Sequence, residues 1–179
     1  MRLRLSGPML ALAGGALLHC SSSSSSSTTG DGGLDCYPDQ DGVTDVPATI
    51  DLVVDDTGFY AGSPDSGADT DAGMKTVITT QNDSTITFTL TNRGTKPHGF
   101  EVECASVLGA YPNPPQGCPS TACFPSNSTI APIDPGTSKT IQFVTPIPDN
   151  VLFPFKSSAP GDASVPGLNG SNGSAWGTM

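Results

Sequence analysis

The sequence has few basic residues: 7 lysines and arginines stand against 17 aspartates and glutamates in 179 residues, for a net charge of −10. Two of the seven, Arg2 and Arg4, lie in a leader that we expect to be removed, which leaves 5 basic residues and 17 − 5 = 12 net negative charges. A protein that binds phosphate backbones needs a clustered basic surface. The composition therefore argues against nucleic acid as a partner.

Histidine is scarcer still. The chain contains only His19 and His98, and His19 lies in the leader. A single imidazole leaves little acid–base chemistry. The sequence also contains no Ser-His-Asp set, phosphate-binding loop, zinc motif or carboxylate pair on an ordered element. We therefore expect a binding or structural role and no enzymatic activity.

No apolar run in the leader is long enough to span a bilayer. The apolar run at residues 9–18 follows Arg2 and Arg4, and its length suits a signal peptide. We predict a signal peptide over residues 1–19. The sequence Leu17-Leu18-His19-Cys20 resembles the lipobox of bacterial lipoproteins, although His19 stands where that family has a small residue.

The lipobox resemblance implies that Cys20 becomes the lipid-modified first residue of the mature chain. The alternative is ordinary cleavage after a small residue such as Ala16. An unbroken serine tract at 21–27 then provides a flexible tether. We expect an exported protein, anchored through lipid to a membrane of the bacterial cell envelope, on the periplasmic side or at the surface. Its partner there would be a protein or envelope component that the sequence does not identify.

The tether leads into an acidic segment. Eleven aspartates and no lysine or arginine occur over residues 31–71. Oxygen ligands at Asp39, Asp41 and Asp45 resemble part of an EF-hand-type calcium loop, but Ala48 stands where a carboxylate is wanted. A solvated acidic loop is the better interpretation. We assign residues 20–46 to the tether and acidic segment, and residues 47–179 to one domain.

Apart from Cys20, the chain has four cysteines, an even number. In an exported chain this predicts two disulfides, and sequence alone leaves three pairings open. A metal site made from these thiols and His98 is the competing interpretation, but no Cys-x-x-Cys pair supports it. The four residues are Cys36, Cys104, Cys118 and Cys123.

Alternating hydrophobicity predicts strands throughout the domain. Residues 84–91 alternate threonines with Ile86, Phe88 and Leu90, and a second strand begins just after His98. Further strands are expected at 49–55, 75–80 and 140–143. Turns are expected at 82–83 and 132–137, with loops at 57–73 and 104–129. No segment reads as a helix, so we expect an all-β sandwich with Greek-key connections.

The segment Thr89-Leu-Thr-Asn92, a short turn and Pro97-His-Gly-Phe-Glu-Val102 resemble the first copper-ligand region of the cupredoxins. The resemblance extends, with gaps, over residues 48–179. It implies a β-sandwich of cupredoxin type, in which the histidine at His98 binds type 1 copper. Residues 177–179 resemble the start of the family's closing strand. We therefore expect that strand to be a stub or cut short, and a missing strand would leave an exposed sheet edge.

Type 1 copper needs two histidines and a cysteine thiolate, often with an axial methionine. The family's second ligand region aligns with residues 153–168 here. In it, Ser157 stands at the position of the cysteine, Pro160 near that of the histidine, and Val165 or Leu168 near that of the methionine. The resemblance thus implies a cupredoxin-like module that has lost type 1 copper and has no cofactor. A copper-binding or electron-transfer protein is the alternative.

His98 itself has three interpretations. It is a partly exposed residue hydrogen-bonded to a neighbouring loop, a weak copper ligand helped by Glu101 or an aspartate, or a relic of the copper site that has a new ligand.

Overall fold

The computed structural model describes residues 36–37, 48–62, 68–70 and 75–179. The predicted signal peptide, Cys20, the serine tether and the calcium-like segment at 39–45 lie outside the described residues. In the described part of the chain, no helix is both long and apolar enough to cross a membrane.

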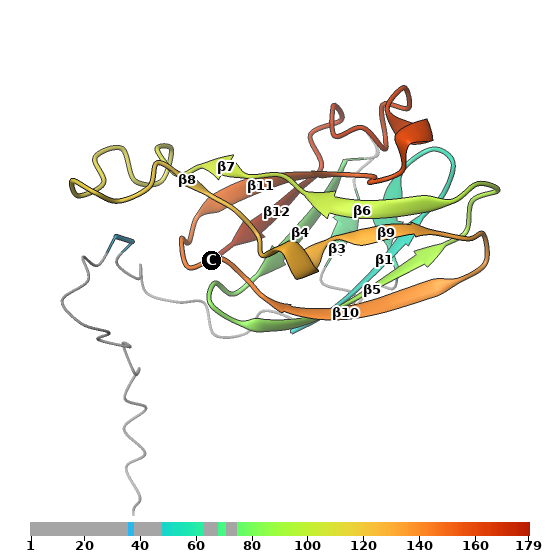
Figure 1. Ribbon diagram of the computed structural model, residues 1–179, viewed down its shortest axis with the longest axis horizontal. Helices are drawn as coiled ribbons and strands as arrows, with labels where there is room; N and C mark the ends of the chain where they lie inside the picture. Colours follow the sequence, from blue (N-terminus) through green and yellow to red (C-terminus); the bar gives the residue numbers. More distant parts are fainter. Residues whose placement is uncertain (1–35, 38–47, 63–67, 71–74) are drawn as a thin grey trace, which may run out of the picture. The chain divides into compact units, whose positions relative to one another are not determined.

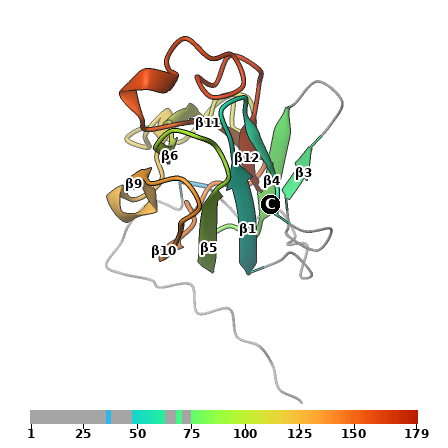
Figure 2. The same ribbon diagram turned by 90° about the vertical axis from the view of Figure 1, so that its right-hand side faces the viewer.

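Two larger β-sheets form the sandwich (Figures 1 and 2), and a third sheet of two strands lies in a loop. The first sheet has the order β10-β5-β1-β2, and the second has the order β3-β4-β12-β11-β6-β9. The strands of the first sheet are β1 (Thr49–Val54), β2 (Phe59–Ala61), β5 (Thr85–Asn92) and β10 (Ser138–Val144). Those of the second are β3 (Ala68–Thr70), β4 (Thr76–Thr80), β6 (His98–Val102), β9 (Ile130–Ile133), β11 (Val151–Lys156) and β12 (Ala175–Thr178).

The connections are of the Greek-key kind. β6 and β9 pair antiparallel, the chain then crosses to β10 in the first sheet, and β11 returns to pair antiparallel with β6. In a Greek key the fourth strand returns to lie beside the first, as β11 does beside β6. The predicted all-β sandwich with Greek-key connections is confirmed.

The alternation in the sequence explains which face of each strand is buried. In β5, Ile86, Phe88 and Leu90 are buried, while the intervening threonines face outward. Rings from both sheets then fill the space between them: Phe100 lies in ring contact with Phe88 and Trp176, at centroid distances of 4.6 Å and 6.2 Å. Aromatic pairs at such distances add to the stabilisation from buried area.

The strand predictions hold for β1, β4, β5, β6 and β10. The loop predicted at 57–73 is wrong in part, because it contains β2 and β3, and Phe59 of β2 is a core residue. Part of the turn predicted at 132–137 belongs to β9. The closing strand is present as β12, which is short but lies between β4 and β11, so the expected open edge does not occur at this position.

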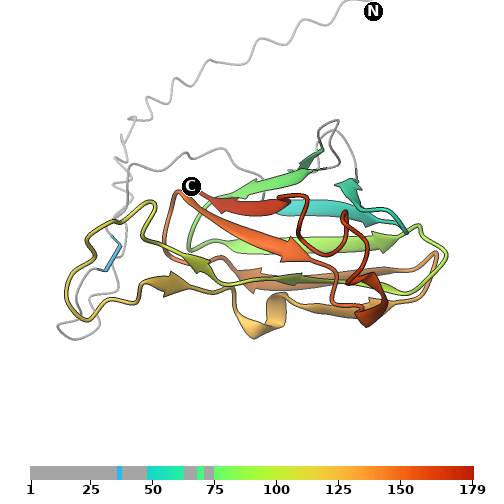
Figure 3. The same cartoon turned by 90° about the horizontal axis from the view of Figure 1, so that it is seen from above.

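A loop between β6 and β9 carries both disulfides. It contains β7 (Ala105–Ser106), β8 (Thr121–Ala122) and the 3₁₀ turn η1 (Ser126–Ser128). Cys104 pairs with Cys123, and Cys36 pairs with Cys118. The prediction of two disulfides is therefore confirmed, and the pairing that the sequence left open is resolved. Figures 1 and 3 show the β7–β8 part of this loop at one end of the sandwich, and a second 3₁₀ turn, η2 (Pro160–Asp162), at the other.

Candidate functional site

His98 is the first residue of β6, directly after the turn that leaves β5. The buried side chain of Asn92 organises this turn. Its Nδ2 donates to the carbonyl oxygens of Lys96 (2.8 Å) and Ile133 (2.9 Å), and its Oδ1 accepts from the Gly94 N–H at 2.8 Å. The turn is thus held at both ends, and it places the His98 ring inside the domain, where the side chain is 1% exposed.

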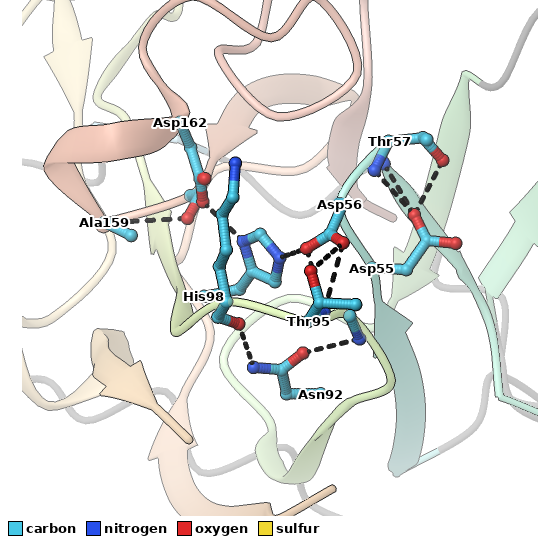
Figure 4. A network of polar contacts seen from close by, with 12 residues as sticks. Asp55, Asp56, Thr57, Asn92, Thr95, His98, Ala159 and Asp162 are labelled. Atoms are coloured by element: carbon cyan, nitrogen blue, oxygen red, sulfur yellow. Dashed lines mark hydrogen bonds and ion pairs between the residues drawn. The ribbon is translucent and has the colours of Figure 1, made fainter. Parts of the chain in front are cut away.

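Both nitrogens of the His98 ring contact carboxylates (Figure 4). Nδ1 lies 2.8 Å from Oδ2 of Asp162, and Nε2 lies 2.9 Å from Oδ1 of Asp56. Asp162 belongs to η2 and Asp56 lies between β1 and β2, so one imidazole joins three segments that are distant in sequence. We call Asp56, His98 and Asp162 the carboxylate–histidine triad.

The chemistry of the triad favours a charged ring. An ionised carboxylate only accepts hydrogen bonds, and both ring nitrogens donate only in the imidazolium form. Burial by itself lowers the pKa of His98, but the hydrogen bonds and negative charges of Asp162 and Asp56 outweigh it and raise that pKa above its ordinary 6.5. The triad therefore stabilises a positive charge inside the domain.

Thr95 supports the Asp56 side of the triad. Its hydroxyl donates to Oδ2 of Asp56 at 2.6 Å, and its N–H lies 3.0 Å from Oδ1. The Thr95 hydroxyl, His98 and the Thr95 N–H together hold the pKa of Asp56 well below its ordinary 3.8. Asp56 thus stays ionised as the partner of His98.

Gly94 lies against the same pair. A Cβ atom at this position would lie 2.6 Å from Nε2 of His98 and 2.7 Å from Oδ1 of Asp56. Cβ atoms essentially never lie this close to a non-bonded heavy atom, so any other residue would push the pair apart. Gly94 is therefore required sterically by the triad.

Ser157, predicted at the position of the family's cysteine, lies just after β11 and is buried. Its hydroxyl accepts from the N–H groups of Gly99 and Ala159, both at 3.2 Å. The structure thus places Ser157 beside the residue that follows His98. In this position it links two backbone segments.

The expectation of a partly exposed His98 is wrong, because two carboxylates from other loops enclose the ring. Its hydrogen bonding to neighbouring loops is as expected. Glu101, the candidate helper ligand, instead pairs with Lys156 at 3.2 Å. Neither Asp56 nor Asp162 could be singled out from the sequence as a partner of His98.

The residues around His98 do not fit type 1 copper. Both ring nitrogens are engaged by carboxylates, and the four cysteines Cys36, Cys104, Cys118 and Cys123 are in disulfides, so none of them offers a thiolate. No second histidine occurs outside the predicted leader. Among the described residues, no group of three or more histidine, cysteine, aspartate or glutamate side chains is arranged to hold a metal ion.

No protein-family model and no curated protein matches the sequence. Solved structures of two auracyanins are similar to it. Dithionite-reduced auracyanin from the photosynthetic bacterium Roseiflexus castenholzii is 17% identical, over 75% of this chain and 99% of that one, with a TM-score of 0.43. Auracyanin B is 14% identical, over 76% of this chain and 93% of that one, with a TM-score of 0.40. Auracyanins are cupredoxins, the family that the sequence around His98 resembles. At these scores and identities, neither likeness carries an argument about what this chain binds.

Proposed function

We propose that this chain is an exported, lipid-anchored β-sandwich of cupredoxin type that works without type 1 copper, as a binding or structural module of the bacterial cell envelope. One observation carries the proposal. At the histidine that the family uses as a copper ligand, a carboxylate occupies each ring nitrogen.

The geometry explains how such a domain remains stable without a metal. A bound cation would join His98 to ligands on other loops. Here the charge lies on the ring itself, and Asp162 and Asp56 supply the opposite charge from η2 and from the β1–β2 connection. Buried charges are tolerated only when they are paired and hydrogen-bonded. The triad meets both conditions.

Two observations support the cellular setting. The paired cysteines fit an oxidising compartment outside the cytoplasm. The leader, the lipobox-like Cys20 and the serine tether support anchoring of the domain through an N-terminal lipid.

Copper titration tests the proposal. The full chain, produced so that its disulfides form, is titrated with Cu(I) and Cu(II) beside a competing chelator, together with His98→Ala. We expect neither protein to bind stoichiometric copper or to develop the intense visible absorption of a copper–thiolate bond.

Stoichiometric binding that is lost in His98→Ala would contradict the proposal. It would favour the alternative, a copper-handling protein in which His98 exchanges its carboxylates for a metal. A variant with Asp162→Ala serves as a control, because it frees Nδ1 while leaving Asp56 and Thr95 in place. If this variant binds copper and the native chain does not, Asp162 is the group that keeps the metal out.

A further inference from the structure

A surface pocket of about 340 Å³ lies at the outer face of the first sheet, where β10 ends. Its volume is at the lower end of the range for ligand pockets, about 300–1,000 Å³. Polar and apolar side chains alternate around it, and none is charged. The lining residues are Thr85, Pro125, Asn127, Gln142, Phe143 and Val144.

Three polar side chains of the pocket have unused hydrogen-bonding capacity. Gln142 donates its Nε2 to the Thr87 hydroxyl (3.1 Å), and Asn127 donates its Nδ2 to the Gln142 carbonyl oxygen (3.0 Å). These bonds orient both amides and leave Oε1 of Gln142 and Oδ1 of Asn127 without a partner among the described residues. The Thr85 hydroxyl also has none in the described part of the chain. The pocket therefore offers two fixed acceptors and one hydroxyl to a ligand that donates hydrogen bonds.

Beyond the pocket, the outer face of β5 and β10 continues without charge. Four cross-strand pairs form it, and two are joined by hydroxyl hydrogen bonds, Thr89 with Thr140 (3.0 Å) and Thr91 with Ser138 (2.8 Å). The strip is about 20 Å long at the usual rise of a strand, and on its β1 side the exposed Asp51 lies beside Thr89. We call it the neutral strip. Its pairs are Thr85 with Val144, Thr87 with Gln142, Thr89 with Thr140, and Thr91 with Ser138.

The absence of charge on the neutral strip narrows the ligand class. Outward strand positions often carry threonine because it favours β structure, and charged residues make up 13% of this chain. Here eight outward positions carry none, in a chain of net charge −10. An ionic ligand would find no counter-charge in the pocket. The eight positions of the neutral strip also carry no aromatic or arginine side chain, the residue types that dominate protein interfaces.

From the pocket and the neutral strip, we infer that this face binds an uncharged polysaccharide. One sugar ring occupies the pocket, donating hydroxyl hydrogen bonds to Asn127 and Gln142 and placing its C–H groups against Pro125 and Val144. Val144 is 47% exposed and provides the apolar contact. Further rings of the chain then lie along the hydroxyls of β5 and β10. This inference rests on the proposed role as an envelope binding module and names its ligand class.

Retention on insoluble polysaccharides tests the inference. The full chain in detergent is mixed with cellulose, chitin or starch granules, and bound protein is measured against the free concentration. We expect saturable binding to at least one of the three. The double variant Asn127→Ala/Gln142→Ala should bind about tenfold more weakly or worse, because it removes both acceptors.

The matched control is Asn113→Ala/Gln116→Ala, which removes two exposed amides from the disulfide-bonded loop and should bind like the native chain. Three outcomes would overturn the inference: no binding to any of the three solids, equal weakening in both double variants, or release of the bound protein by soluble hyaluronate, an anionic polysaccharide, at an equal concentration of sugar. Copper titration of the same preparations is scored separately, so this inference and the proposed function can fail independently.

Discussion

His98 holds two acidic side chains close together, and the consequence of removing it follows from their burial. The Asp162 side chain is 6% exposed, and Asp56 is 35% exposed but bound by Thr95. Without the imidazolium, the buried Asp162 carboxyl would have no cationic partner among the described residues. Truncating one partner of a buried ion pair typically costs about 3–5 kcal/mol.

We therefore predict that His98→Ala lowers the free energy of unfolding by about 3–5 kcal/mol, measured by urea denaturation. Asp51→Asn, an exposed charge change on β1, is the control and should shift stability by no more than about 0.5 kcal/mol. A loss of under about 1 kcal/mol in His98→Ala, the range of exposed ion pairs, would mean that the triad contributes no more than a surface contact.

The same residues set the pH dependence of stability. The folded-state pKa of His98 is raised above 6.5, so its stabilisation is complete below that pH and is lost as the pH rises through the raised value. The folded-state pKa of Asp56 is lowered below 3.8, so its stabilisation is present above that pH and is lost as the pH falls through the lowered value.

We therefore expect stability to be greatest between about pH 4 and 6.5, and to decline toward alkaline pH. Urea denaturation at a series of pH values from 4 to 9 measures this profile. His98→Gln, which has no titrating ring, should remove the decline above neutral pH. If the native protein gained stability from pH 6.5 to 9, the imidazolium would not be the form that the fold stabilises.

At the scale of strands, the sequence predicted most of the elements that alternate strongly, but not β11, in which Val151, Phe153 and Phe155 alternate with less buried residues. β1, β5 and β10 each show period-two alternation, because one face packs in the core and the other meets water. β2 and β3 have three residues each, too few for a period to emerge, and β12 carries its core residue, Trp176, between a glycine and an alanine.

The triad shows why the site was harder to predict than the fold. His98 could be found because the surrounding motif is local in sequence. Asp56 comes just after β1, which pairs parallel with β5 so that Val54 lies beside Asn92. A correct prediction of this pairing would have placed Asp56 near the β5–β6 turn. Asp162 comes from the long connection between β11 and β12, and no local pattern brings it to the ring. Contacts of this kind depend on tertiary packing.

The two disulfides act on different lengths of chain. Cys104–Cys123 closes a separation of 19 residues, and Cys36–Cys118 closes one of 82. If a cross-link acts mainly by restricting the unfolded chain, the longer closure stabilises more, at about 4–5 kcal/mol against about 3.

We predict that Cys36→Ser/Cys118→Ser lowers the free energy of unfolding more than Cys104→Ser/Cys123→Ser does, as measured by chemical denaturation. Alkylation under denaturing conditions, followed by mass measurement, first verifies that each variant keeps its other disulfide. The reverse order would show that folded-state contacts of the β7–β8 loop, such as the packing of Tyr37 on Tyr111, outweigh the effect of loop length.

At the scale of the whole molecule, the net charge affects how the chain can be held at a membrane. A chain of net charge −10 is repelled by an anionic membrane surface, and a single acyl chain gives only marginal, reversible membrane binding. Stable retention therefore requires more than one chain on the same residue or a second signal. The sequence offers no polybasic patch, since it holds 7 basic residues in all.

We therefore predict that membrane retention depends on Cys20 alone and involves a multiply acylated cysteine. Native full-length protein expressed in a bacterium should enter the detergent phase on Triton X-114 separation, and Cys20→Ser should move to the aqueous phase while keeping both disulfides. Metabolic labelling with a fatty acid should mark only the native protein. Entry of Cys20→Ser into the detergent phase would contradict the prediction. It would mean that the uncleaved leader holds the protein there and that lipid on Cys20 is not needed.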